Sequence, residues 1–423
     1  MRSRRVAFEE PARARHGQAA ARDRRKGHLR EAEPARSRPA GSGAPRRARG
    51  FRQAAGCARG RLVKTKLKVG VLGATGMVGQ RFVALLAEHP WFEVTVVAAS
   101  PKSAGRAYEE AVAGRWALGS PTPEATKKLV VKDAGDVSGI AGEVDLVFSA
   151  TDMTKEETLA LEDAYAAAET PVVSNNSAHR ATPDVPMMIP EVNGAHAAVI
   201  EAQRKRRGTT RGFVAVKPNC SLQSYVPALA PLMGYRPSRI AVATYQAISG
   251  AGKTFETWPE MVDNLIPYIK GEEEKSEREP LKIFGSLEGG RIVDASRPVI
   301  SAQCIRVPAS DGHMAAVFAS FDEKPSENDI LAAWKGFVGR PVELGLPSAP
   351  SPFLTYFEDP SRPQTKLDRD IGNGMGVAIG RLRPDSLFDY RFVCLSHNTV
   401  RGAAGGAVLT AELLVAEGYI AAR

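Results

Sequence analysis

Short apolar runs and helical spacings of apolar residues alternate along the first half of the chain. The apolar runs predict buried strands at residues 68–74, 92–100, 143–151 and 170–180, the last of which continues into a polar loop. Between them, apolar residues at helical spacing predict helices at residues 77–90 and 155–169. Strands and helices of this length in alternation are typical of a parallel, doubly wound sheet of the Rossmann type.

After residue 220 the pattern changes to longer strands in which apolar and polar positions alternate. Such strands are predicted at residues 239–249, 301–310 and 313–321, and they indicate an α+β domain with a mixed or antiparallel sheet. The final residues predict a helix rich in small residues, which can pack closely against another element. We therefore expect a disordered basic extension, a Rossmann domain, a second domain and a C-terminal helix that returns to the first, at residues 1–63, 64–216, 217–390 and 391–423.

The extension at residues 1–63 shows no sustained period of 2 or 3.6 and contains almost no large apolar residues. Such a segment cannot bury enough surface to offset its ordering entropy, so disorder is predicted. A basic arm that binds nucleic acid is one interpretation, and an organelle transit peptide is another, although its acidic residues argue against it. We favour translation from a start codon upstream of the true one, because residues 62–76 look like an ordinary enzyme N-terminus.

The net charge of +10 arises in this extension. Residues 1–64 contain 19 Lys or Arg and 5 Asp or Glu, so the remainder of the chain has a net charge of −4. The folded part is therefore not expected to bind nucleic acid.

The length of the apolar runs and the spacing of the cysteines limit the class of protein to which the chain can belong. No run approaches the roughly 18 apolar residues of a membrane helix, and no apolar segment of a secretory signal lies near the N-terminus. The four cysteines are widely spaced, which predicts neither a disulfide framework nor a cysteine zinc site. We expect no membrane contact, no metal, and a reducing, cytoplasmic location.

A glycine loop follows the first predicted strand and opens the first predicted helix. Gly73, Gly76 and Gly79 have a GxxGxxG spacing. A tight turn leaves the strand there, and the N–H groups and dipole of the helix start can hold a pyrophosphate. At the head of a βαβ unit this loop indicates dinucleotide binding, with a plain strand-to-helix turn as the alternative. The candidate cofactor contacts are Gly73, Thr75, Gly76, Met77, Val78 and Gly79.

The end of the second strand bears on which dinucleotide binds. An NAD-specific site would have Asp or Glu there for the ribose 2′-hydroxyl. This chain has Ser100, Lys102, Ser103 and Arg106 instead. Hydroxyls and cations suit a 2′-phosphate, so the sequence favours NADP, with an exposed basic loop as the alternative. The Rossmann domain is thus predicted to bind NADP.

Cys220 lies between an apolar run and a helical pattern. The dipole and free N–H groups of a helix start favour a thiolate and lower the pKa of a thiol. The same groups can hold an oxyanion, and Asn219 adds a side-chain amide. With a nicotinamide domain, this suggests aldehyde addition to the sulfur, hydride transfer to NADP, and a thioester that phosphate cleaves, assisted by a base. A buried structural cysteine is the alternative, and Cys304 and Cys394 are expected to be inert.

Several separate segments together resemble aspartate-semialdehyde dehydrogenases of the branch shared by archaea, fungi and some bacteria. They are "GATGMVGQ", "PNCSLQ", "GEEEKSE", "RVPASDGHMA" and "HNTVRGAAGGAVLTAELL", and the resemblance covers about residues 64–423. It implies a glyceraldehyde-phosphate-dehydrogenase-like fold whose second domain serves catalysis and dimerisation. It also implies the reversible, NADP-dependent reductive dephosphorylation of L-4-aspartyl phosphate to L-aspartate 4-semialdehyde, on the route to Lys, Thr, Met and Ile.

The resemblance assigns Cys220 as the acyl-thioester nucleophile and His313 as the general acid and base. Arg306 matches an arginine that binds the substrate α-carboxylate, a task that suits the planar guanidinium. Arg306 and His313 are seven residues apart in the sequence, which on a strand would be about 23 Å. They can meet one small substrate only if the chain bends at residues 308–312, where turn-forming residues occur.

Further matches concern the rest of the substrate and the cofactor. Glu272 and Lys275 match a Glu-x-x-Lys pair in which the Glu takes the substrate amino group and the Lys helps to hold phosphate. Because three glutamates follow one another, the choice between Glu272 and Glu273 stays open. The resemblance also implies phosphate contacts from Asn176, Ser177 and Arg180, and contacts near the nicotinamide from Ser249, Gly250 and Asn398.

The expected partners are the small-molecule substrate, inorganic phosphate and further copies of the chain in a homodimer or homotetramer. N-acetylglutamyl-phosphate reductase and malonyl-CoA reductase use the same Cys and His chemistry and are the alternative enzymes, although Glu272 argues mildly against the second. A glyceraldehyde-phosphate dehydrogenase would be expected to carry an acid at the end of the second strand, and this chain has none there. A non-catalytic dinucleotide sensor with a DNA-binding arm is the alternative of another class, and it predicts binding without turnover.

Overall fold

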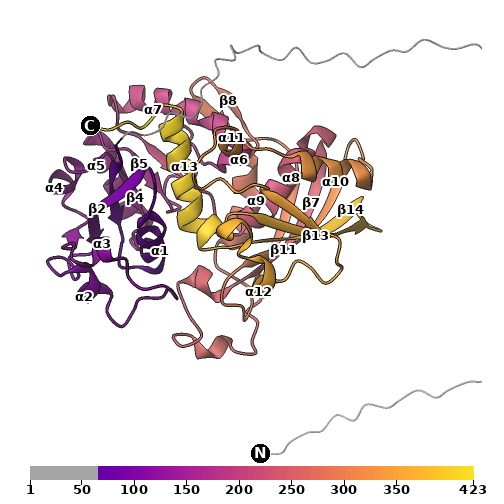
Figure 1. The fold of residues 1–423 in the computed structure, drawn as a ribbon. Helices are drawn as coiled ribbons and strands as arrows, with labels where there is room; N and C mark the ends of the chain where they lie inside the picture. Colours follow the sequence, from indigo (N-terminus) through magenta and orange to yellow (C-terminus); the bar gives the residue numbers. More distant parts are fainter. Residues whose placement is uncertain (1–64) are drawn as a thin grey trace, which may run out of the picture. The chain divides into compact units, whose positions relative to one another are not determined.

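The computed structural model describes residues 65–423, so the extension predicted at residues 1–63 lies outside the described residues. Two six-stranded sheets and the helices that cover them make up most of this part (Figure 1). A separate two-stranded ribbon is formed by β8 (Ser286–Glu288) and β9 (Arg291–Val293).

The first sheet has six parallel strands in the order β3-β2-β1-β4-β5-β6. Successive residues of one strand belong to different core clusters: Val147 to one, Leu146 and Phe148 to the other. The sheet is therefore buried on both faces, which explains why its strands read as continuous apolar runs. The strands are β1 (Leu67–Leu72), β2 (Phe92–Ala99), β3 (Lys132–Asp133), β4 (Leu146–Ser149), β5 (Val172–Ser174) and β6 (Val214–Val216).

Helices connect these strands. The helix predicted at residues 77–90 ends at Leu86, because a turn precedes Pro90. The helices are α1 (Met77–Leu86), α2 (Tyr108–Val112), α3 (Glu124–Lys127), α4 (Val137–Ala141), α5 (Lys155–Ala167), α6 (Pro190–Asn193) and α7 (Val199–Arg207), with the 3-10 turn η1 (Gly194–Ala198).

Two glycines make the turn between β1 and α1 possible. Gly73 has a φ of +81°, and a Cβ there would lie 2.2 Å from the carbonyl oxygen of Ala150. A Cβ at Gly79 would lie 2.1 Å from the carbonyl oxygen of Gly73. Both positions therefore require glycine, because the helix must start close to the strand that precedes it.

The second sheet is mixed, with the strand order β10-β7-β11-β14-β13-β12. The two outer pairs are parallel and the central pairs are antiparallel. Together with the first sheet, it confirms the predicted fold class. The strands are β7 (Pro237–Gln246), β10 (Val299–Arg306), β11 (His313–Phe321), β12 (Leu354–Phe357), β13 (Val377–Pro384) and β14 (Tyr390–Ser396).

Helices α8, α9 and α10 pack against strands of this sheet. Side chains of β7 and β10 that point the other way stay partly exposed, and Val299 and Tyr245 are 66% and 37% exposed. The helices are α8 (Leu222–Leu229), α9 (Glu272–Ile283), α10 (Glu327–Gly336), α11 (Arg340–Glu343) and α12 (Thr365–Asp368). The 3-10 turns are η2 (Ala230–Tyr235), η3 (Ile248–Ala251), η4 (Pro259–Met261) and η5 (Ile371–Gly374).

The chain ends in a short π-helical segment, η6 (Val400–Ala404), and helix α13 (Gly405–Ala416). α13 contacts α1 and β5, and Figure 1 draws it in yellow beside the first sheet. β14 lies in the second sheet and ends at Ser396, within the C-terminal segment predicted at residues 391–423. No helix within residues 65–423 is long and apolar enough to cross a membrane.

Candidate active site

Cys220 lies in the turn between β6 and α8, two residues before the helix starts. Burial raises the pKa of its thiol, and so does the nearby carboxylate of Glu272, while Lys217, Arg180 and Arg306 act in the opposite direction. The predicted lowering of this pKa is therefore wrong for the protein without substrate. The reason is that desolvation and a neighbouring carboxylate outweigh the cations, and neither could be seen in the sequence.

His313 is the first residue of β11 and is completely buried. Its Nε2 lies 3.4 Å from Cys220 Sγ, and its Nδ1 accepts a hydrogen bond of 3.1 Å from the N–H of Ala247. Because Nδ1 accepts, the proton of the neutral ring is assigned to Nε2 and faces the sulfur. Burial and the charge of Arg306 lower the pKa of His313 to about 3, so the imidazole is neutral.

Arg306 ends β10, and its Nη1 donates to the carbonyl oxygen of Ala247 at 2.6 Å. The predicted bend is present, because residues 307–312 cross the end of β7, which lies between β10 and β11. Arg306 is 5% exposed and forms no ion pair within residues 65–423. A Cβ added at Gly250 would lie 2.9 Å from Arg306 Nη1 and 3.0 Å from the His313 ring, so the three residues are in close contact.

Glu272, the first residue of α9, is the glutamate that faces this site. It accepts hydrogen bonds from Asn219 Nδ2 at 2.9 and 3.0 Å and from Gln246 Nε2 at 3.2 Å, and it pairs with Lys275 Nζ at 2.8 Å. Glu273 instead accepts from the backbone N–H of Cys304 in β10.

Asn219 precedes Cys220 and lines the same cavity. Its Nδ2 donates to Glu272, and its Oδ1 accepts from the N–H and hydroxyl of Ser221 at 2.8 Å each. The side-chain amide therefore contacts Glu272 and lines the Cys220 cavity. It fixes Glu272 relative to the turn that carries Cys220.

The loop after β5 carries the residues expected to contact phosphate. Asn176 Nδ2 donates to Ser149, Thr151 and Glu162 at 3.0–3.2 Å, so this side chain would present its carbonyl to the cavity. Arg180 Nη1 pairs with Glu279 at 3.0 Å, while its Nε is buried without a hydrogen-bond partner.

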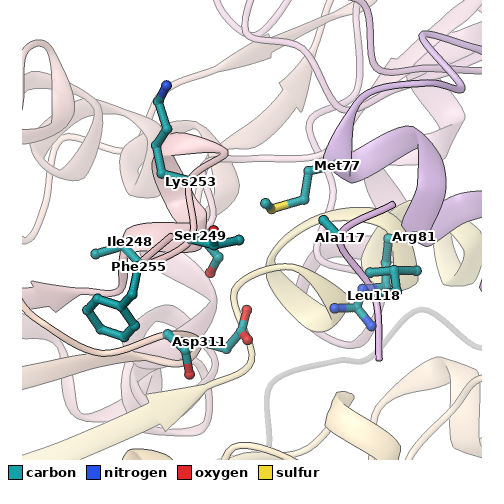
Figure 2. Close-up of a pocket in the computed structure, with 11 residues that line it drawn as sticks. Met77, Arg81, Ala117, Leu118, Ile248, Ser249, Lys253, Phe255 and Asp311 are labelled. Atoms are coloured by element: carbon teal, nitrogen blue, oxygen red, sulfur yellow. The ribbon is translucent and has the colours of Figure 1, made fainter. Parts of the chain in front are cut away.

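A single cavity of about 300 Å³ brings most of the predicted residues together. Its lining includes both catalytic and cofactor candidates: Val78, Asn176, Ser177, Arg180, Asn219, Cys220, Ser249, Gly250, Glu272, Lys275 and Asn398. Asn398 is held by Ser249, since its Nδ2 donates to the Ser249 hydroxyl at 2.8 Å. A smaller pocket of about 110 Å³ is also lined by Ser249. Figure 2 shows Met77 of α1 pointing toward Ser249 in this pocket.

The glycine loop lines a separate cavity of about 300 Å³ with Ser100 and Arg115. Arg115 Nη2 donates to the Ser103 hydroxyl at 3.3 Å, so this arginine and both serines lie close together. Lys102 is exposed and does not line the cavity, and Arg106 is bonded to the carbonyl of Glu110. Arg115 was not predicted from the sequence, because it follows the second strand by 16 residues and no local pattern marks it.

Lys217 is a second residue that the sequence analysis missed. It is completely buried three residues before Cys220, and its Nζ donates to the carbonyl of Pro218 at 2.5 Å. No carboxylate within residues 65–423 pairs with it at ion-pair distance. Burial and the charge of Arg180 lower its pKa to about 7. Lys217 directly follows β6 in the sequence "VAVKP", a pattern typical of an ordinary strand end, so no local signal marks it.

Within residues 65–423, no group of three or more His, Cys, Asp or Glu is placed to hold a metal ion. Cys304 and Cys394 are buried in the second sheet.

Two family descriptions match the chain: "Semialdehyde dehydrogenase, NAD binding domain" at residues 68–200 and "Semialdehyde dehydrogenase, dimerisation domain" at residues 229–401. Aspartate-semialdehyde dehydrogenase of Archaeoglobus fulgidus is 44% identical over 359 residues, which cover 84% of this chain and 100% of that protein. The enzyme of Aspergillus fumigatus is 41% identical over 364 residues, covering 84% and 99%.

A solved structure shows the same fold. The crystal structure of aspartate-semialdehyde dehydrogenase with NADP from Candida albicans superposes with a TM-score of 0.76 at 38% identity, and the match covers 84% of this chain and 100% of that one.

Proposed function

The chain belongs to the aspartate-semialdehyde dehydrogenase family, and from this premise we propose how its residues divide the reaction among them. The enzyme interconverts aspartyl phosphate and aspartate semialdehyde in amino-acid biosynthesis. The observation that carries the proposed roles is the 3.4 Å contact between Cys220 Sγ and His313 Nε2, beside a buried Arg306 without a carboxylate partner in the described part of the chain.

Cys220 forms the covalent bond to the acyl carbon, and His313 assists from Nε2. A proton on Nε2 can hydrogen-bond first to the thiolate and then to the oxygen that becomes negative when the sulfur adds to the carbonyl. To accept a proton at Nε2, the ring must first release the N–H of Ala247 from Nδ1. His313 therefore acts as a donor to the oxyanion in the arrangement observed.

Because His313 is neutral, the positive charge that opposes the thiolate must come from elsewhere. Lys217 is the largest of the charges that lower the pKa of Cys220, followed by Arg180 and Arg306. We assign Lys217 as the buried counter-charge of Cys220. Arg306 is paired when the substrate α-carboxylate binds, whereas Lys217 has no carboxylate partner within residues 65–423.

The remaining polar groups divide the substrate between them. Arg306 takes the α-carboxylate, Glu272 takes the amino group, and Lys275 lies between Glu272 and the phosphate. Arg180 and Ser177 complete the phosphate site, and the open Nε–H of Arg180 supplies one donor. Asn219 positions Glu272 instead of touching the substrate.

The chain carries an NAD(P)-binding domain, and we propose NADP as its cofactor. At Gly76 an added Cβ would meet only the Gly73 carbonyl, at 3.5 Å, so the loop leaves its cavity side open to a pyrophosphate. Ser100, Ser103 and Arg115 suit a 2′-phosphate, and a relative was solved with NADP. NADP, when bound, supplies the hydride acceptor of the oxidative direction.

Arg115 provides the test of this preference. Arg115→Gln should lower the ratio of kcat/KM for NADP to that for NAD by about tenfold, which is the loss of one charge-assisted hydrogen bond. Arg106→Gln, outside the cavity, is the matched control and should leave the ratio unchanged.

The dimerisation domain implies a homo-oligomer. We propose a homodimer or homotetramer that uses the partly exposed face of β7 and β10, where Val299 and Tyr245 lie. Light scattering of Val299→Glu against the unaltered protein tests this assignment. A cytoplasmic location and the predicted domain boundaries at residues 64–216 and 217–390 remain predictions.

The reaction itself is tested by phosphate-dependent formation of NADPH from aspartate semialdehyde, with N-acetylglutamate semialdehyde as the comparison substrate. We expect turnover only with the first. Cys220→Ala should abolish turnover while NADP still binds, because the cofactor contacts lie mainly on the glycine loop. Measurable turnover of Cys220→Ala would remove the covalent role of this residue.

A further inference from the structure

A second cavity of about 460 Å³ opens beside the Cys220 cavity. Ser177, Arg180 and Lys275 line both of them, so the two cavities adjoin at the residues assigned to phosphate. The second cavity is formed by the start of α5, the loop after β5, and α9. Its volume lies in the range of ligand-binding pockets.

The lining of this cavity is rich in positive charge. Five of its residues are cations and three are carboxylates: Lys155, Arg180, Lys275, Arg278 and Lys282 against Glu274, Glu279 and Asp294. Glu279 is already engaged by Arg180 and by the backbone N–H of Asn219. Lys155 and Arg278 are exposed at the mouth and form no ion pair within the part of the chain that the structure describes. The cavity therefore attracts anions.

The inner wall is held in place by Lys282. Its Nζ donates to the carbonyls of Arg180 and Thr182 at 2.7 Å each, which fixes the turn that carries Ser177 and Arg180. The Nε of Arg180 remains buried without a partner. Within the described residues, the Nε–H of Arg180 is thus a free hydrogen-bond donor where the two cavities adjoin.

Another part of the lining of the Cys220 cavity comes from residues assigned to the cofactor. Val78, Ser249 and Asn398 line it there, and all three are candidates for contact with the cofactor. A bound cofactor would cover that part, so a second anionic reactant needs another approach.

We propose that phosphate enters and leaves the active site through the basic cavity, separately from the cofactor. This inference rests on the proposed function. In the oxidative direction a phosphate oxygen bonds to the acyl carbon, the C–S bond to Cys220 breaks with its electrons on sulfur, and the remaining phosphate proton passes to water. The acyl phosphate of the reverse direction presents the same dianionic group to the same opening.

The test separates phosphate from the other reactants by charge. Phosphate is a dianion, whereas aspartate semialdehyde has no net charge and NADP has its own cavity. The double variant Lys155→Glu with Arg278→Glu reverses two exposed charges at the mouth and touches no assigned catalytic residue. Its KM for phosphate should rise about tenfold, as expected for lost electrostatic steering, while kcat at saturating phosphate and the KM values for NADP and semialdehyde stay within about twofold.

Two further variants distinguish steering from unspecific effects. Ala181→Trp narrows the same cavity without changing charge, and it should lower kcat/KM for phosphate alone. Lys335→Glu reverses an exposed charge on α10, far from the cavity, and should change nothing. The KM for phosphate should also depend less on salt in the double variant than in the unaltered enzyme.

The proposal is overturned if the double variant keeps the KM for phosphate of Lys335→Glu, or if the KM values for all three reactants rise together. Absence of phosphate-dependent turnover in the unaltered enzyme would instead overturn the proposed function. The two failures are therefore distinguishable.

Discussion

Replacing Lys217 by Met should make the protein more stable below neutral pH and make Cys220 less reactive. The ammonium group is buried without a carboxylate partner in the described residues, so the folded protein bears a desolvation cost that an apolar side chain of similar length avoids. The same charge favours the Cys220 thiolate. One substitution should therefore move stability and function in opposite directions.

The size of the stability change follows from the pKa of Lys217. Folding lowers this pKa from 10.5 to about 7. Each tenfold change in proton affinity corresponds to about 1.4 kcal/mol, so the folded state loses up to about 5 kcal/mol at low pH. Because the unfolded chain binds more protons between pH 7 and 10.5, stability of the unaltered protein rises with pH across this window. The advantage of Lys217→Met is thus largest below pH 7 and disappears above pH 10.5.

Two assays measure the two effects. Urea unfolding at pH 6 and pH 9 gives the free energy of unfolding, and the gain of Lys217→Met should be larger at pH 6. Alkylation of Cys220 by iodoacetamide across pH gives the thiol pKa, which should rise when the opposite charge of Lys217 is lost. Lys335→Met, at an exposed position on α10, is the control for both.

If the gain in the free energy of unfolding did not depend on pH, the assignment of Lys217 as a buried titrating group would be wrong. An unchanged alkylation profile would refute the counter-charge role, even if stability increased.

Three other substitutions test the arrangement around the nucleophile. Arg306→Lys should keep the fold and NADP affinity but cost about 2 kcal/mol in kcat/KM for the semialdehyde, because the carboxylate loses one of two parallel hydrogen bonds. A loss in NADP affinity instead would identify Arg306 as a cofactor residue. Gly250→Ala should lower kcat/KM by about 10–100-fold with little change in Tm, since its Cβ displaces Arg306 by tenths of an ångström. Gly336→Ala, with open space around it, is the control and should leave kcat/KM unchanged. Glu191→Gln leaves the completely buried Arg401 without its charge partner and should lower the free energy of unfolding by about 3 kcal/mol in urea titrations; an unchanged value would contradict the pairing.

The sequence predicted the first sheet well because its strands are buried on both faces and its glycine loop has a steric cause. Gly73 and Gly79 cannot carry a Cβ where they lie, so the motif reports the backbone directly. The candidate nucleophile Cys220 was indicated by its place before a helical pattern, and its partners came from resemblance to a family. The structure brings most of them to one cavity.

What the sequence did not reveal depends on contacts between distant segments. The counter-charge at Lys217, the arginine at residue 115 and the engagement of Asn219 by Glu272 each require knowing which groups face each other after folding. The direction of the Cys220 pKa was missed for the same reason, since desolvation is a property of the packed site and not of a helix start. Local pattern identifies the reactive residue, whereas the fold decides its protonation.

Ala247 anchors two functional groups at once, since its N–H holds His313 and its carbonyl holds Arg306. The relative placement of the two side chains is therefore a function of the φ and ψ angles of one residue, −62° and 152°. Displacements of the end of β7 carry both groups together and leave their spacing intact, whereas a small rotation at Ala247 changes both in a correlated way. Directed evolution of this site should consequently meet strong epistasis: changes near Ala247 alter oxyanion stabilisation and carboxylate binding jointly, and adjusting either side chain alone cannot restore both.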